Sequence, residues 1–236
     1  MRRVADTPEL LDGPLHPAML RGNLRDLGRI NRWLGGADLS RRAIRELADA
    51  LGPRHDLSVI DVGTGGADLP LDLLTTWGAR WPRLRVTAVD VQHEVLAAAR
   101  DLRPALDAVR GLELALADGR ALPFPDRAFD VSHASLVVHH LEPGDAVAFL
   151  RELGRVASAA VVINDLSRAW VHWLGAVTIS RCCTANRYTR HDAPLSVRRT
   201  YTATELRGLM ADAGLRPLGT LHGFLGHRYA VSARVG

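Results

Sequence analysis

Two groups of residues in this chain could do chemistry, and each follows a run of apolar residues. The first is Gly63-Thr64-Gly65, which follows the apolar residues Val59, Ile60 and Val62 of an expected strand and precedes an acid, Asp68. A strand that feeds a glycine-rich turn and then a helix presents backbone N–H groups to a nucleotide-like ligand. Glycine also allows backbone angles that are closed to other residues, so a ligand can approach the main chain. A tight turn in any parallel sheet would look similar, so the turn alone does not identify a ligand.

The second group is the pair His139-His140, which follows an expected strand over residues 129–134. Ligands of doubly wound sheets sit at the carboxyl ends of the strands, and this rule selects the pair. An imidazole with a pKa near neutrality can take a proton from a phenol or an alcohol. We therefore expect His140 or His139 to be catalytic, with simple packing or capping of the turn as the alternative.

Asp165 is the third candidate for catalysis, because it follows an expected strand over 159–164. Its carboxylate could orient one of the two histidines or hold an amine of the substrate. Equally, it could cap a helix or pair with Arg168.

The chain shows a consistent pattern after the glycine turn, in which each expected strand leads to a small polar or acidic residue. These residues are Asp90 after 85–90, Asp118 and Gly119 after 112–117, and Ser135 after 129–134. The glycine turn and these three strand ends make four motifs in a fixed order. With them, residues 57–141 resemble a class I S-adenosylmethionine-dependent methyltransferase of the ubiquinone/menaquinone-methyltransferase-like type. Ala67 stands where many members have a third glycine.

The resemblance implies that S-adenosylmethionine is the cofactor. It implies that Asp90 accepts hydrogen bonds from both ribose hydroxyls and that Asp118 faces the adenine amino group. The cofactor-binding residues implied in the core are Asp61, Gly63, Thr64, Gly65, Asp90, Val91, Asp118, Gly119 and Ser135.

The resemblance also implies that the loop at 31–36 closes over the cofactor. Arg32 or Arg41 would then meet the methionine carboxylate by a charge-assisted hydrogen bond. The alternative for the glycines of this loop is a simple helix stop.

The glycine pattern separates this class from the dinucleotide-binding dehydrogenases, which also carry an acid after their second strand. The turn lacks the Gly-x-Gly-x-x-Gly spacing and is followed at once by Asp68. An acid at that position would repel a diphosphate at the helix N-terminus. The pattern therefore favours a cationic sulfonium cofactor over NAD.

The alternation of strand and helix signals predicts an α/β fold with a doubly wound, mostly parallel seven-stranded sheet and an antiparallel last strand. We expect one methyltransferase domain over 1–236, with enough chain for a full core. Its parts are an N-terminal helical cap (1–56), a cofactor-binding core (57–166), a lid insert (167–202), and a C-terminal helix and hairpin (203–236).

Three local features are also expected. Residues 1 to about 16 are interpreted as a mobile arm, because they carry Pro8, Gly13 and Pro14 and are followed by Pro17. Ser40 is a plausible N-cap for a helix over 41–51. A further helix is expected over 93–109.

The lid mixes aromatic and polar groups, which indicates a pocket for an aromatic or polyketide-like acceptor. The candidate substrate-binding residues are Trp170, Trp173, Tyr188 and His191. The alternative for the tryptophans is the ordinary core of a helix.

Composition limits the possible partners. The formal net charge is +4 and all 30 basic residues are arginine, but no dense basic tract with interleaved aromatic residues occurs. We therefore expect no nucleic-acid partner. We also expect no membrane span, because no window of about 18 apolar residues occurs.

Two further expectations concern redox state and metal. The two cysteines are adjacent, which fits a reduced, cytoplasmic location better than a disulfide. We expect no metal centre, because Asn164 and Asp165 alone are too few oxygen ligands for metal-dependent catechol chemistry.

The sequence therefore predicts S-adenosylmethionine-dependent methylation of a small-molecule acceptor, with O-methylation of a secondary metabolite favoured. A quinone-type C-methyltransferase, an RNA methyltransferase and an inactive cofactor-binding protein are the alternatives. The oligomeric state is not predicted.

Overall fold

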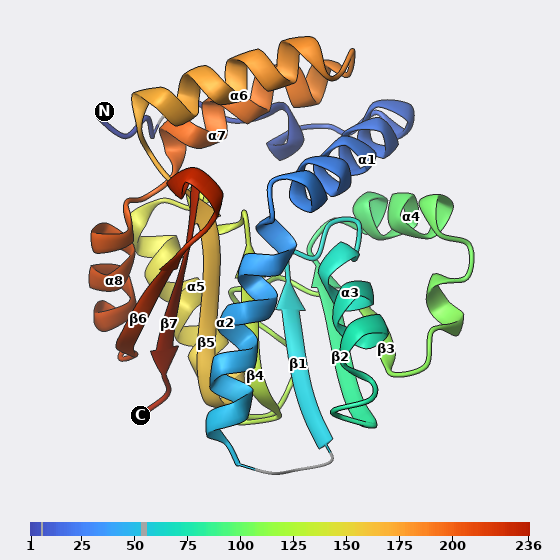
Figure 1. Ribbon diagram of the computed structural model, residues 1–236, viewed down its shortest axis with the longest axis vertical. Helices are drawn as coiled ribbons and strands as arrows, with labels where there is room; N and C mark the ends of the chain where they lie inside the picture. Colours follow the sequence, from blue (N-terminus) through green and yellow to red (C-terminus); the bar gives the residue numbers. More distant parts are fainter. Residues whose placement is uncertain (6, 53–55) are drawn as a thin grey trace.

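The polypeptide is described by a computed structural model over residues 1–5, 7–52 and 56–236, and it folds around one sheet. Within these residues the sheet has seven strands in the order β3-β2-β1-β4-β5-β7-β6 (Figure 1). The strands are β1 Asp56–Val62, β2 Arg83–Asp90, β3 Leu112–Leu116, β4 Phe129–Ser135, β5 Ala157–Leu166, β6 Arg216–His222 and β7 Arg228–Arg234. β1 to β5 pair in parallel, whereas β7 runs antiparallel to both β5 and β6. The predicted fold class is therefore confirmed.

Helices lie on both faces of the sheet and across its carboxyl end. They are α1 Pro17–Trp33, α2 Gly36–Ala50, α3 Asp68–Trp77, α4 His93–Leu102, α5 Pro143–Val156, α6 Trp170–Cys182, α7 Arg187–Arg199 and α8 Ala203–Asp212. Single 3-10 turns are η1 Leu10–Asp12, η2 Leu106–Ala108, η3 Val138–His140 and η4 Phe224–Gly226. None of the helices in the described ranges is both long enough and apolar enough to cross a membrane.

Two hydrophobic cores form because successive strand residues point to opposite faces of the sheet. Ile60 packs on one face with Phe149 of α5 and Leu206 of α8. Val59 packs on the other face with Ile44 of α2 and residues of α3. Together the cores hold the parallel strands in register, so their carboxyl ends meet at one edge.

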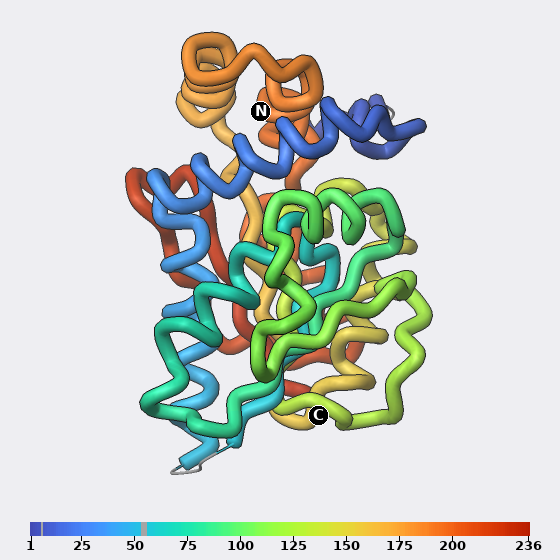
Figure 2. Tube along the Cα trace, turned by 90° about the vertical axis from the view of Figure 1, so that its right-hand side faces the viewer, coloured from blue at the N-terminus to red at the C-terminus, as the bar shows by residue number. Residues whose placement is uncertain are grey.

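A helical layer covers that edge (Figures 1 and 2). It consists of α6, α7, α1 and the N-terminal segment, which lie side by side across the ends of the strands. α1 lies directly over the glycine turn, because a Cβ placed on Gly65 would be 3.7 Å from the Leu24 side chain.

Three local predictions were wrong. α2 begins at Gly36 after Gly35 in the left-handed conformation, so Ser40 lies inside the helix, where it is buried. The helix expected over 93–109 ends at Leu102, because Pro104 cannot continue it, and a separate turn follows. The expected mobile arm is folded, and its contacts form part of the candidate site.

Candidate active site

The glycine turn connects β1 to α3 through three residues in the left-handed region. Gly63 has φ 74°, Gly65 has φ 55°, and Ala67 has φ 56°. The N–H groups of Gly63 and Thr64 both donate to the carbonyl of Val89 at the end of β2, at 2.8 and 3.0 Å. Ala67 therefore adopts the conformation usually left to glycine, and it does so while fully buried.

Asp90 ends β2 beside this turn. Its Oδ2 accepts the N–H of Gly65 at 3.2 Å, and its Oδ1 accepts the N–H of Gln92 at 3.1 Å. Burial raises the pKa of this carboxyl, although the backbone hydrogen bonds act in the opposite direction. Val91 follows with its side chain exposed. The structure thus brings Asp90 and the glycine turn together.

Asp118 and Gly119 follow β3. The carboxylate of Asp118 binds the guanidinium of Arg120 at 2.9 Å, and this hydrogen bond lowers the pKa of Asp118. Gly119 is buried, and a Cβ at this position would collide with the ring of Phe149. Ser135 is half-buried at the end of β4.

The two arginines considered for the methionine carboxylate differ in their surroundings. Arg41 binds Asp72 at 2.8 Å and also pairs with Asp38. Arg32 is exposed, and its charge acts on Asp68 at the start of α3.

An arginine that sequence reasoning missed reaches the glycine turn. Arg103 pairs with Asp68 and donates to the carbonyl of Gly66 at 2.6 Å. The only feature of the sequence that could have indicated this contact is the position of Arg103, just past the end of α4 and immediately before Pro104.

A buried chain of hydrogen bonds runs from the glycine turn toward α2. Thr64 Oγ1 donates to Asp61 Oδ2 at 2.7 Å, and Asp61 Oδ1 lies 2.6 Å from Nδ1 of His133. The Nε2 of His133 lies 2.8 Å from Ser40 Oγ, which also accepts Nδ2 of Asn164 at 2.8 Å.

This chain contains a serine, a histidine and an aspartate in hydrogen-bonded sequence, as in a hydrolytic triad. Their exposed fractions are 1% for Ser40, 0% for His133 and 4% for Asp61, so no substrate reaches the serine. We infer a structural role, in which the chain fixes the ends of β1, β4 and β5 and the start of α2 relative to the glycine turn.

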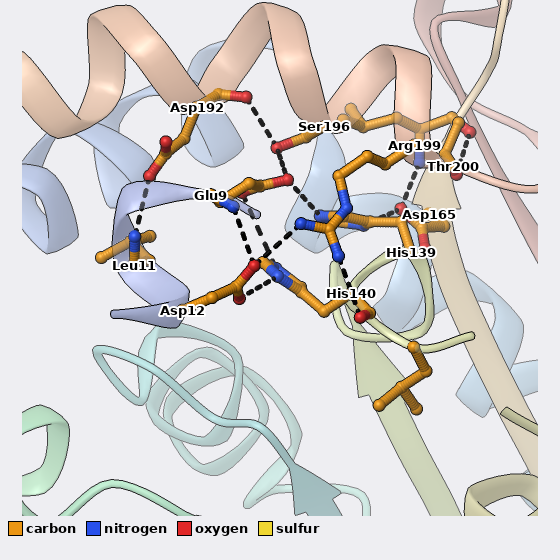
Figure 3. A network of polar contacts seen from close by, with 12 residues as sticks. Glu9, Leu11, Asp12, His139, His140, Asp165, Asp192, Ser196, Arg199 and Thr200 are labelled. Atoms are coloured by element: carbon orange, nitrogen blue, oxygen red, sulfur yellow. Dashed lines mark hydrogen bonds and ion pairs between the residues drawn. The ribbon is translucent and has the colours of Figure 1, made fainter. Parts of the chain in front are cut away.

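The predicted histidine pair lies in η3, and each ring is held by an aspartate (Figure 3). The Nδ1 of His139 is 2.8 Å from Asp165 Oδ1, and the Nδ1 of His140 is 2.7 Å from Asp12 Oδ1. The two rings stack with their centroids 4.3 Å apart. Burial acts to raise the pKa of Asp165, but the charge and hydrogen bond of His139, the N–H of Leu166 and the charge of Arg228 together outweigh it, and the pKa lies below its usual value. Asp165 therefore orients a histidine, whereas Arg168 pairs with Glu205.

The other side of the histidine pair is closed by the N-terminal segment. Glu9 Oε1 lies 3.6 Å from Nε2 of His139, and Glu9 Oε2 lies 3.9 Å from Nε2 of His140 (Figure 3). Burial raises the pKa of Glu9 to about 7, even though the charge of His140 lowers it. Sequence reasoning missed both Glu9 and Asp12.

Helix α7 holds this segment in place. Ser196 Oγ donates to Glu9 Oε1 at 2.9 Å, and Asp192 accepts the backbone N–H groups of Leu10 and Leu11. Arg199 binds Asp12 Oδ2 at 2.8 Å. These contacts are the reason why the described residues of the N-terminal segment form an ordered turn.

The four predicted substrate residues do not converge on one place. Trp170 and Trp173 pack edge to face on α6, with Trp170 66% exposed. Tyr188 is buried on α7, and its hydroxyl accepts the N–H of His16 at 3.0 Å. His191 binds its neighbour Asp192 at 2.7 Å.

The glycine turn at 63–65 and the turn that carries His139 and His140 are in direct contact. A Cβ placed on Gly63 would collide with a methyl group of Val137, which lies two residues before His139. The two turns therefore lie side by side at the carboxyl edge of the sheet.

Residues 59–159 match the family model described as a methyltransferase domain. A phosphatidylethanolamine N-methyltransferase from Cereibacter sphaeroides is 33% identical over 112 residues, which is 47% of this chain and 51% of that protein. A demethylmenaquinone methyltransferase from Chlorobaculum tepidum is 30% identical over 134 residues, which is 57% of this chain and 48% of that protein. The chain thus spans about half the length of these curated relatives.

The crystal structure of an S-adenosylmethionine-dependent methyltransferase from Aquifex aeolicus is similar with a TM-score of 0.64. It is 21% identical, and the match covers 94% of this chain and 100% of that one. At this identity the likeness shows the fold.

Proposed function

We propose that this chain, a class I S-adenosylmethionine-dependent methyltransferase of the ubiquinone/menaquinone-methyltransferase-like type, transfers a methyl group to a hydroxyl oxygen of a small-molecule acceptor. The acceptor class that we favour is an aromatic or polyketide-like metabolite. The observation that supports the proposal is the contact of Gly63 with Val137, by which the turn that carries the histidine pair packs against the glycine turn.

The residues around the glycine turn fit the cofactor. The turn holds Gly63 and Gly65 at positive φ, which glycine adopts freely, and it lies at the carboxyl end of β1, where ligands of doubly wound sheets bind. Asp90 would bind the ribose hydroxyls, and Asp118 with Gly119 would lie at the adenine. Of the two arginines, Arg32 is the better partner for the methionine carboxylate, because Arg41 already holds two aspartates.

When bound, the cofactor supplies an electrophilic methyl group on its sulfonium. The protein then has to align the acceptor oxygen and receive its proton. His140 is the better proton acceptor, because its side chain is 25% exposed whereas that of His139 is 3% exposed. Asp12 would stabilise the imidazolium that forms, and Asp165 with His139 would fix the turn.

A second candidate is a quinone-type acceptor methylated at carbon. Two observations favour it: the similarity to a demethylmenaquinone methyltransferase, and three exposed apolar side chains on α6, Trp170, Val171 and Leu174. Such a face would suit an acceptor with an apolar tail.

We further propose that the protein acts in the cytoplasm and not on nucleic acid. Both cysteines, Cys182 and Cys183, are free and exposed, which suits a reducing compartment.

The test offers the protein two acceptor sets, hydroxylated aromatic compounds and demethylated quinones, together with cofactor deuterated in its methyl group. Mass-spectrometric fragmentation then locates the label. Label on oxygen of a hydroxylated aromatic compound is expected and should fall at least tenfold in His140→Ala but not in His222→Ala, an exposed histidine on β6. Label on ring carbon of a quinone would overturn the O-methyltransferase assignment in favour of the second candidate.

A further inference from the structure

We infer that Glu9, His139 and His140 form a binding site for one divalent transition-metal ion of the zinc class. One nitrogen from each histidine and one oxygen of Glu9 lie within 4.8 Å of one another. The three residues come from two distant parts of the chain, η3 and the N-terminal segment, which α7 holds against each other.

The hydrogen bonds of the histidines determine what faces the centre of this site. A carboxylate accepts hydrogen bonds, so the Nδ1 atoms next to Asp165 and Asp12 each carry a proton. In the neutral rings both Nε2 atoms therefore present lone pairs, and both point at the carboxylate of Glu9. Three lone-pair donors that converge on one point are matched by a cation placed between them.

The distances are close to those of a metal site. Bonds of about 2.1 Å at tetrahedral angles place two ligand atoms about 3.4 Å apart. Glu9 Oε1 lies 3.6 Å from Nε2 of His139, and Glu9 Oε2 lies 3.9 Å from Nε2 of His140. Both separations exceed the metal-site value by less than 1 Å, so an ion would draw the ligands together by a small shift.

The donor set indicates the kind of ion. Two imidazoles and one carboxylate suit zinc and the neighbouring first-row ions, whereas calcium and magnesium prefer oxygen ligands. Three protein ligands leave one position open, as in catalytic zinc sites.

The surroundings supply the supporting interactions that metal sites use. Each ligating histidine donates its second N–H to a carboxylate, and Ser196 holds Glu9, as is usual around bound metal. Four carboxylates, those of Glu9, Asp12, Asp165 and Asp192, gather here near two cations, Arg199 and Arg228. The excess of negative charge favours a cation.

This inference departs from the sequence-based expectation of no metal centre, which considered only Asn164 and Asp165. It concerns the same site as the proposed function, but it gives His139 and His140 the role of metal ligands in place of that of proton acceptors. An acceptor hydroxyl bound at the open position would be acidified by the ion, so the histidines would not need to take its proton.

The experiment measures metal binding and needs no acceptor, so it can succeed or fail independently of the proposed function. The protein over residues 1–236 is stripped with chelator, dialysed and titrated with Zn²⁺ by calorimetry. A parallel titration with Co²⁺ follows the visible absorption of a tetrahedral nitrogen- and oxygen-ligated ion. We expect one equivalent of either ion.

The variants His139→Ala, His140→Ala and Glu9→Gln should each bind Zn²⁺ at least tenfold more weakly, whereas His222→Ala should bind it normally. Circular dichroism identifies the variants that keep their fold. Asp165→Asn, which leaves all three ligands in place, should weaken binding by about 10- to 100-fold. Absence of stoichiometric binding to the wild-type protein, or unchanged binding in folded His140→Ala and Glu9→Gln, would overturn the assignment.

Discussion

Gly63 and Val137 are packed so closely that no side chain fits between them: a Cβ on Gly63 would occupy the space of the Val137 Cγ2 methyl group. Gly63 opens the glycine turn, and Val137 opens the turn that carries His139 and His140. This contact fixes the position of the proposed cofactor-binding turn relative to the histidine pair.

Gly63→Ala should therefore weaken the binding of S-adenosylhomocysteine at least tenfold. Alanine at φ 74° costs about 1–2 kcal/mol, and the collision with Val137 adds to this. Calorimetry gives the affinity. The double variant Gly63→Ala/Val137→Ala removes the collision and should recover part of the loss. No recovery would show that the contact does not limit the position of the turn.

Asp90→Ala should also weaken binding of S-adenosylhomocysteine at least tenfold. The change removes charge-assisted hydrogen bonds worth about 1.5–3 kcal/mol and leaves the N–H of Gly65 without its partner. The matched control is Asp107→Ala, which removes an exposed carboxylate paired with Arg100. Equal affinities for wild type and Asp90→Ala would refute the ribose assignment.

The stability of the metal-free protein should depend on pH through Glu9. Between its ordinary pKa of 4.5 and the raised pKa of about 7, the folded protein holds a proton on Glu9 that the unfolded chain has lost. The free energy of unfolding should therefore decrease as the pH rises across this range. Chemical denaturation at a series of pH values in the presence of EDTA measures it.

The variant Glu9→Gln cannot ionise, so its stability should change less between pH 4.5 and 7 than that of the wild type. A wild-type profile that rises over this interval, or profiles of equal slope, would contradict the burial of Glu9. Asp12 acts in the opposite sense, because its pKa is lowered: its contribution is complete above 3.8 and is lost only as the pH falls below that value, outside the interval measured.

Ser40→Ala should destabilise the protein by about 1–3 kcal/mol, because His133 and Asn164 would each lose a partner in the buried chain. Thermal and urea unfolding give the difference. Thr75→Ala, which removes an exposed hydroxyl that bonds only within its own helix, is the control and should change little. A loss in Ser40→Ala no larger than in the control would mean that the buried chain does not hold the elements together.

Local sequence carried enough information to predict the sheet and the glycine turn. The strand before Gly63 and the acid at Asp90 are contiguous patterns, and their positions follow from strand ends meeting at one edge. The positions of His139 and Asp165 were predictable for the same reason, since β4 and β5 are neighbours in register.

The remainder of the site could not be read from the sequence because its contacts span large separations in the chain. Glu9 and Asp12 reach the histidines from a proline-containing segment whose order comes from α7, not from any local pattern. Ser40 has the residue type of a helix cap, but Gly35 already provides the bend that starts α2. In both the N-terminal segment and the start of α2, contacts between distant parts of the chain determine the structure, and local sequence does not.

The measurement that tests the central claim most directly uses S-adenosylmethionine labelled in its methyl group. The protein and the cofactor are incubated with a lysate of the source cell. The amount of label is then measured separately in the solvent-extractable small molecules and in the RNA. A reaction with Asp90→Ala gives the background. We predict label in the small-molecule fraction that depends on the wild-type protein. Label confined to RNA, or equal label with Asp90→Ala, would contradict the account.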